Sequence, residues 1–171
     1  MTTFGPYDPT NEEVLDLLEK AGAGDMAGVK HIIDAHPEAV NWSYFNNKNT
    51  PLIIAAERGP VEMVHYLLDK GANIDQPQWN NGTPLSFASF EGKSENVAAL
   101  LKRGAKIPAS GPPENIKRNE REIHSLFTKA AQARRDNELN AVAAGVASGT
   151  TRGVRPLKPP SFKKKPAGFS A

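Results

Sequence analysis

The sequence predicts an all-α fold in which pairs of helices stack into a solenoid, with a C-terminal capping helix and an extended tail. The first observation is a repeat of 33 residues, because residues 50–74 and 83–107 are identical at twelve aligned positions. The second is that each copy opens with Thr-Pro-Leu, a helix start, and carries glycines where helices must end. The third is that one such helix pair cannot bury both of its faces, so neighbouring copies must stack.

Composition sets the outer limits of this prediction. The chain has 171 residues, of which 39% are hydrophobic and 23% charged, enough for one core. The absence of cysteine excludes disulfides, thiol nucleophiles and thiolate metal sites. No apolar run approaches the roughly 20 residues of a membrane span, and the polar, acidic opening residues fit neither a secretory signal nor an import peptide. We therefore expect a soluble protein in the cytoplasm, cytosolic or cytoskeleton-associated, with the nucleus as the alternative.

The first helix pair, about residues 11–48, follows an N-terminal arm of residues 1–10. Its first helix is expected at about residues 11–21, because Thr10 and Glu13 have the spacing of a capping box. Residues 24–33 align with residues 59–68 at an offset of 35 and predict its second helix. A polar, atypical first pair is what the end of a solenoid requires.

The second and third helix pairs are expected at residues 49–81 and 82–107. Thr50 and Thr83 are good N-caps, and each is followed by proline at the first helical position. Apolar residues recur at helical spacing in both halves of each copy. The glycines at the predicted helix ends, which are suited to left-handed caps, are Gly59, Gly71, Gly92 and Gly104.

These motifs resemble the ankyrin repeat. Residues 50–75 carry the Thr-Pro-Leu entry, the paired alanines, the central glycine, the Leu-Leu pair and the Gly-Ala exit, and residues 83–107 repeat most of them. The histidine that usually follows Thr-Pro-Leu in the family is replaced by Ile53 and Ser86, which removes a side-chain hydrogen bond that ties down the loop. The resemblance implies an ankyrin-repeat solenoid of three repeats that binds other proteins and is not an enzyme.

In ankyrin-like proteins, the loops between repeats and the outward positions of the first helices form a concave groove. Aromatic residues in the two predicted loops favour a partner-binding role, because aromatic side chains are common interface anchors. The alternative is that successive loops stack their aromatic rings on each other for stability. The candidate groove residues are Trp42, Tyr44, Phe45, Glu57, Arg58, Trp79, Asn80, Phe90 and Glu91.

The C-terminal third departs from the repeat. Residues 108–113 have the composition of a linker, and a helix is expected over residues 114–145, with Ile116, Ile123, Phe127 and Ala130 on one stripe. This helix either covers the open face of the last repeat or docks a partner.

Residues 146–171 form a basic, proline-rich tail that is expected to be disordered unless bound. From residue 152 onward the tail contains no acidic residue, whereas residues 1–151 hold 15 basic and 19 acidic side chains. The tail either contacts an acidic surface or serves as solvated charge. Its candidate binding residues are Arg152, Arg155, Lys158, Lys163, Lys164 and Lys165.

Motifs for catalysis are absent from the sequence. It has no phosphate-binding glycine loop, no nucleophile elbow and no His-Glu-x-x-His metal helix. His31 and His65 occupy nearly equivalent positions in adjacent repeats, but no cysteine or third histidine is placed to complete a zinc site. We therefore expect no catalytic, cofactor-binding or metal-binding residue.

The sequence as a whole predicts a protein-interaction module, an adaptor or structural accessory subunit of a larger assembly. The alternative is a nucleic-acid-associated or nuclear regulator that acts through the basic tail.

Overall fold

The computed structural model describes residues 9–147, with side chains described as far as residue 142. All regular elements in this range are helical, so the all-α prediction is confirmed. The helices are α1 (Asn11–Ala23), α2 (Met26–Ala35), the short 3-10 helix η1 (Pro37–Asn41), α3 (Pro51–Arg58), α4 (Val61–Asp69), α5 (Pro84–Glu91), α6 (Ser94–Lys102) and α7 (Glu120–Ala147).

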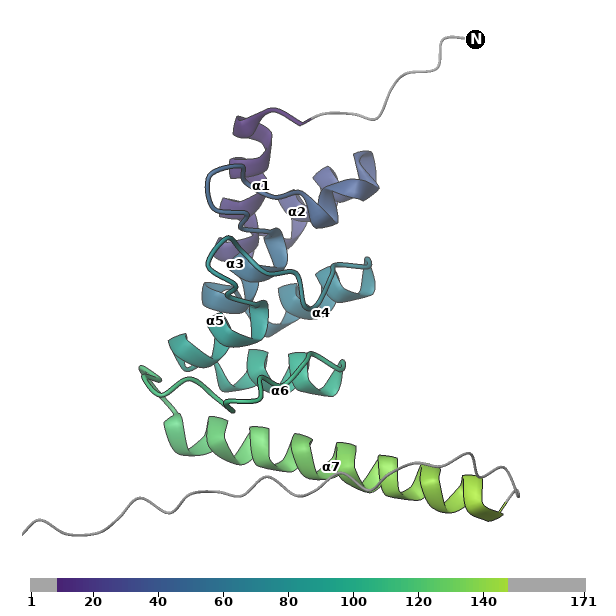
Figure 1. Cartoon of the computed structure of the whole chain (residues 1–171). Helices are drawn as coiled ribbons and strands as arrows, with labels where there is room; N and C mark the ends of the chain where they lie inside the picture. Colours follow the sequence, from purple (N-terminus) through teal and green to yellow (C-terminus); the bar gives the residue numbers. More distant parts are fainter. Residues whose placement is uncertain (1–8, 148–171) are drawn as a thin grey trace, which may run out of the picture. The chain divides into compact units, whose positions relative to one another are not determined.

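The first six α-helices form two layers (Figure 1). In one layer α3 packs between α1 and α5, and in the other α2, α4 and α6 follow the same order. Residues 51–56 of α3 are all buried, because this helix has a repeat on either side. Ala55 and Ala56 are completely buried, and their small side chains let the neighbouring helices approach closely.

The predicted helix starts are confirmed. The hydroxyl of Thr50 accepts a hydrogen bond from the backbone N–H of Ile53 at 3.3 Å, and Thr10 forms a capping box with Glu13. At Thr83 the backbone N–H donates to Oγ of Ser86 at 2.8 Å. Ser86 thus fixes the entry to α5 at the position where the family usually has histidine.

The glycines at the helix ends differ in backbone conformation. Gly71, Gly92 and Gly104 adopt the left-handed conformation that the sequence predicts. Gly59 has a φ of −74°, so a left-handed cap is wrong at this position. A Cβ on Gly59 would lie 2.8 Å from the carbonyl oxygen of Ala21, so glycine here allows α1 and α3 to approach closely.

Asn96 of α6 joins the second repeat to the third. It is buried, and its side-chain N–H groups lie 3.2, 3.1 and 3.2 Å from the carbonyl oxygens of Ala55, Ala56 and Gly59. These carbonyls lie in the last turn of α3, where a helix runs short of backbone donors. The Ala55 carbonyl also accepts from the backbone N–H of Gly59 at 2.9 Å, and the Asn96 amide adds a side-chain donor. A side chain from the next repeat therefore completes the helix end of the previous one.

A second series of contacts joins the loops that leave each repeat. Oδ1 of Asn41 accepts from the backbone N–H of Asn73 at 2.8 Å. Oδ1 of Asp75 accepts from the backbone N–H of Lys106, also at 2.8 Å. In both cases a short polar side chain holds the backbone of the following repeat about one period away, so successive loops stay in register.

The last long helix, α7, begins at Glu120 rather than at the predicted Glu114. The intervening segment is a loop that lies against the end of α5. The backbone N–H of Lys117 donates to the carbonyl of Phe90 at 2.9 Å, and the side-chain amide of Asn119 donates to the carbonyl of Gly92 at 2.9 Å. These tertiary bonds and the positive φ of Asn119, 56°, are incompatible with a helix through this segment.

The first part of α7 covers the last repeat. Ile123 and Phe127 are buried in the same apolar core as Leu100 of α6. The guanidinium of Arg134 donates to the carbonyl of Ala105 at 2.5 Å. Residues from Arg135 onward belong to a second compact unit, in which the helix continues to Ala147 and exposes Leu139 and Val142.

Candidate functional site

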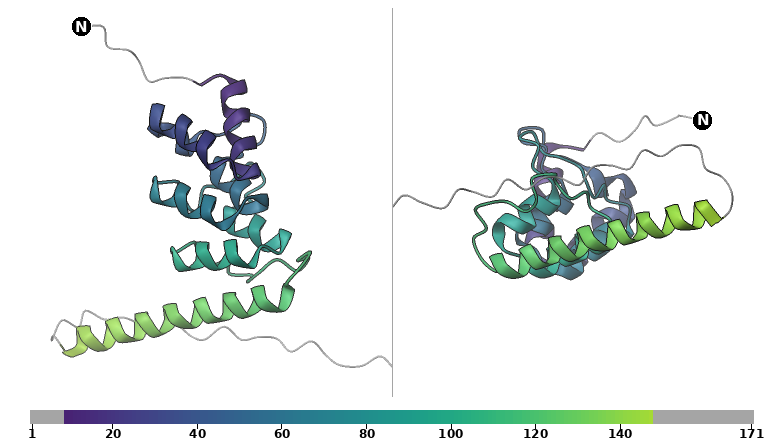
Figure 2. Two further views of the ribbon diagram at one scale, coloured as in Figure 1. Left: turned by 180° about the vertical axis from the view of Figure 1, so that it is seen from behind. Right: turned by 60° about the horizontal axis from the view of Figure 1, so that its bottom comes forward.

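Two loops project from the same side of the helix stack and lie next to each other (Figure 2, right). We call residues 43–49 the first finger and residues 76–83 the second finger. The backbone N–H of Trp79 donates to the carbonyl of Asn47 at 3.1 Å, which joins the two fingers directly.

Each finger is a tight turn held by its own backbone. In the first, the N–H of Tyr44 donates to the carbonyl of Asn49 at 2.9 Å, and Lys48 adopts a positive φ of 58°. In the second, the N–H of Gln78 donates to the carbonyl of Gly82 at 2.9 Å, and Asn81 has a φ of 64°. The side chains at the finger tips are therefore presented on fixed turns.

The structure brings two of the predicted aromatic contacts together at these tips. Phe45 is 66% exposed and Trp79 is 71% exposed. Tyr44 is half-buried, and its ring meets that of Phe45 edge to face at a centroid distance of 5.1 Å. Asn80 is exposed, and its side-chain Oδ1 accepts from the backbone N–H of Gly82 at 2.9 Å, which supports the second finger.

Trp42 does not belong to the groove, and its prediction as an exposed contact is wrong. It is only 8% exposed, because η1 turns the chain back and places the indole against the first helix pair. Its ring lies 5.8 Å from that of His36. Trp42 is therefore part of the core of the first repeat.

The predicted contacts on the first helices have mixed environments. Arg58 is exposed and Glu57 half-buried at the end of α3. Phe90 and Glu91 at the end of α5 already contact Lys117, whose ammonium lies 4.7 Å from the Phe90 ring centroid and 2.5 Å from the Glu91 carboxylate. Sequence reasoning missed Lys117, because it assigned residue 117 to a helix instead of a loop.

The basic tail, Arg152 to Lys165, lies outside the described residues.

Within residues 9–147 no cluster of three or more metal-ligating side chains is close enough to hold a metal ion. No helix in that range is long and apolar enough to cross a membrane.

Family comparison agrees with this architecture. The family model for ankyrin repeats, in three copies, matches residues 17–110. This chain belongs to the ankyrin-repeat family. Ankyrin repeats are protein-interaction modules, and the resemblance seen in the sequence is therefore confirmed for the fold and for this general role.

Two curated relatives share a short segment with this ankyrin-repeat protein. It is 36% identical over 59 residues to the E3 ubiquitin-protein ligase XBAT33 of Arabidopsis thaliana. It is 32% identical over 59 residues to the probable E3 ubiquitin-protein ligase XBOS33 of Oryza sativa subsp. japonica. The shared segment is 34% of this chain and only 12% and 11% of the two relatives.

Proposed function

We propose that this chain is a non-catalytic adaptor or accessory subunit, acting in the cytoplasm, whose partner protein binds across the two finger tips. The observation that carries the proposal is the exposure of Phe45 and Trp79 on adjacent fingers that are joined by a backbone hydrogen bond. Burying a large aromatic side chain contributes about 1.5–3 kcal/mol. Two such side chains on a fixed surface are suitable anchors for a protein interface.

The contacts within the fingers favour this role over a purely structural one. The bond between the fingers is made by the backbone of Trp79, so the fingers stay together without the indole ring. The Phe45 ring meets the ring of its neighbour Tyr44 within the first finger and still stays 66% exposed. A partner that covers the exposed indole would explain the presence of so large a ring at position 79.

Ligase activity is not part of the proposal. The two relatives are named as E3 ubiquitin-protein ligases, but the similarity covers about an eighth of their length. The role that we infer from them is limited to binding a protein through the repeats. The basic tail would add contacts to an acidic surface of the same assembly, with a nucleic acid as the alternative ligand of the tail.

The test is a native co-purification with the tagged full-length chain and a Phe45→Ala/Trp79→Ala variant. We expect the variant to lose a partner protein that the unaltered chain retains, while its circular dichroism spectrum stays unchanged. The matched control is Leu15→Ala, which shortens another exposed apolar side chain, 44% exposed on α1. The control should retain the partner.

A chain ending at Ala147 forms the second arm of the experiment. If the finger variant retains every partner and the truncated chain loses them, the tail is the binding element and the finger proposal is wrong. If both variants lose the same partner, the fingers and the tail act on one assembly.

A further inference from the structure

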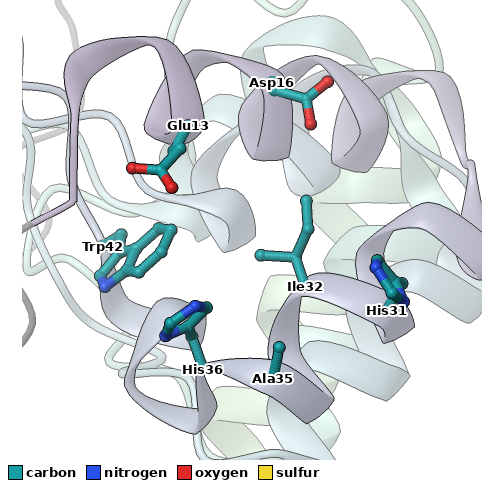
Figure 3. Close-up of a pocket in the computed structure, with 7 residues that line it drawn as sticks. All are labelled: Glu13, Asp16, His31, Ile32, Ala35, His36 and Trp42. Atoms are coloured by element: carbon teal, nitrogen blue, oxygen red, sulfur yellow. The ribbon is translucent and has the colours of Figure 1, made fainter.

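A cavity of about 200 Å³ lies between α1 and α2 in the first repeat (Figure 3), and its lining includes neither Phe45 nor Trp79. Pockets for drug-sized molecules measure about 300–1,000 Å³, so this one suits a single side chain better than a whole small molecule. The residues that line it are Glu13, Asp16, His31, Ile32, Ala35, His36 and Trp42.

The lining has an apolar part and a carboxylate part. Ile32 and Ala35 come from α2, and the rings of Trp42 and His36 stand beside them with centroids 5.8 Å apart. The carboxylates of Glu13 and Asp16 come from α1 on the other side of the cavity (Figure 3). This arrangement suits a side chain with an aliphatic stem and a cationic head.

The two carboxylates are held in place by neighbours. Oε2 of Glu13 accepts from the backbone N–H and the hydroxyl of Thr10, both at 2.8 Å. Asp16 forms an ion pair with Lys20 one turn later, and this hydrogen bond raises the pKa of Lys20 above its ordinary value. Thr10 therefore fixes the orientation of the Glu13 carboxylate, and Lys20 competes with any cation that approaches Asp16.

Net charge favours the same class of ligand. Residues 11–41 carry seven acidic and two basic side chains, whereas residues 42–147 carry eleven acidic and thirteen basic ones. The negative field of the described chain is thus concentrated on the first repeat, where it attracts cationic groups.

We propose that this cavity binds an arginine side chain of a partner protein. The stem of the arginine would lie on Ile32 and Ala35, its planar guanidinium against the Trp42 and His36 rings, and its N–H groups toward Glu13 and Asp16. Arginine is favoured over lysine because a guanidinium stacks on aromatic faces and offers several N–H donors in one plane. The cavity is separate from the finger surface and gives the first repeat a binding role of its own.

The first test uses Trp42 as the reporter in a full-length Trp79→Phe chain, which leaves one of the two tryptophans. Its fluorescence is titrated with the tripeptide acetyl-Gly-Arg-Gly-amide and with the same peptide carrying citrulline, the neutral isostere of arginine. We expect a saturable change with the arginine peptide and about tenfold weaker binding of the citrulline peptide, since hydrogen bonds to a charged group are the stronger ones. A lysine peptide should bind more weakly than the arginine peptide.

Substitutions then locate the site. In the same Trp79→Phe chain, Glu13→Gln and Asp16→Asn should each weaken binding about three- to tenfold, and Lys20→Gln should strengthen it about threefold by removing the competing cation. The matched controls are Glu12→Gln and Glu19→Gln, which remove the same charge from α1 at positions outside the lining. Circular dichroism verifies that every variant is folded.

Three results would overturn the proposal. The first is equal binding of the arginine peptide and either the citrulline or the lysine peptide. The second is an equal loss of affinity in the control and cavity variants, which would indicate only long-range attraction to an acidic helix. The third is a Trp42 signal that does not saturate. None of these results bears on the finger surface, so the proposed function is tested separately.

Discussion

The C-terminal ends of α3 and α5 occupy equivalent places in successive repeats, yet different parts of the chain cover them. At α3 the amide of Asn96, from the next repeat, donates to the Gly59 carbonyl at 3.2 Å. At α5 no further repeat follows within residues 9–147, and the amide of Asn119 donates to the Gly92 carbonyl at 2.9 Å. The loop before α7 thus reproduces, with unrelated sequence, a contact that the repeats make with each other.

The comparison extends to the two glycines. Gly59 has a φ of −74° and Gly92 a φ of 75°, although both end the first helix of a repeat. A Cβ on Gly92 would lie 2.4 Å from the carbonyl oxygen of Arg118 in the covering loop. Identical residues one period apart are therefore required for different reasons, set by what packs against them.

The largest predicted loss of stability comes from a substitution in α7, the helix that covers the third repeat. Phe127→Ala should lower the free energy of unfolding by about 3–5 kcal/mol, because it empties a buried aromatic position. Urea unfolding of the full-length chain, followed by circular dichroism, measures the change. Leu139→Ala on the same helix is the control, since Leu139 is 67% exposed and its loss should have little effect. Equal effects of the two changes would show that α7 does not cover the repeat.

We expect an intermediate loss of stability when either Asn96 or Asn119 is replaced, the two residues that cover the ends of α3 and α5. Asn96→Ala should destabilise the chain by about 2–3 kcal/mol, because it leaves three carbonyls with one buried donor fewer. Asn119→Gly should cost about 1 kcal/mol, because that amide makes one partly buried bond and glycine tolerates the positive φ. Urea unfolding followed by circular dichroism measures the loss of stability in each of the two variants. The reverse order would mean that the covering loop contributes more than the contact between repeats.

The smallest effect concerns an exposed ion pair that also joins two repeats, Lys70 with Asp34 at 3.2 Å. The hydrogen bond to Asp34, followed by the Coulomb interaction with Tyr66, raises the pKa of Lys70 above its ordinary value of 10.5. The stabilisation from this shift is fully present below the ordinary pKa and is lost as the pH rises through the raised value.

Asp34→Asn should therefore lower the pKa of Lys70 in an NMR titration without a resolvable change in the urea midpoint at pH 7. Glu62→Gln removes a charge from the same helix as Tyr66 and is the control, which should leave the Lys70 titration in place. An unchanged pKa in Asp34→Asn would contradict the assignment of the shift to this pair.

Sequence reasoning succeeds where the fold depends on local, periodic signals. The 33-residue period, the threonine caps and most of the helix-ending glycines are properties of short segments, and the helices follow them closely. The sequence also predicts Phe45 and Trp79 as exposed finger residues, because they lie in the loops between predicted repeats, and both are exposed.

The wrong predictions concern residues whose burial or secondary structure is determined by tertiary contacts. The sequence predicts Trp42 at the surface because this residue falls in the expected loop between the first two repeats, but Trp42 directly follows η1 and is buried. The sequence predicts an early start for the last helix because Ile116 extends the apolar stripe of Ile123 and Phe127. Hydrogen bonds from Lys117 and Asn119 to the end of α5 instead hold this segment as a loop. The cavity in the first repeat has no sequence signature, since Glu13 also serves as a capping residue and Asp16 also forms a pair along its own helix.

The contacts between the exit loops bear on how the array could be lengthened. Asn41 and Asp75 each offer a side-chain oxygen to the repeat that follows. One period after Asp75 stands Pro108, whose side chain has no hydrogen-bond acceptor. An additional repeat appended after Ile107 would therefore find no side-chain oxygen at position 108 to accept from its backbone N–H. Lengthening the solenoid by duplication would require aspartate or asparagine at position 108, and the loop that leads to α7 would have to be displaced.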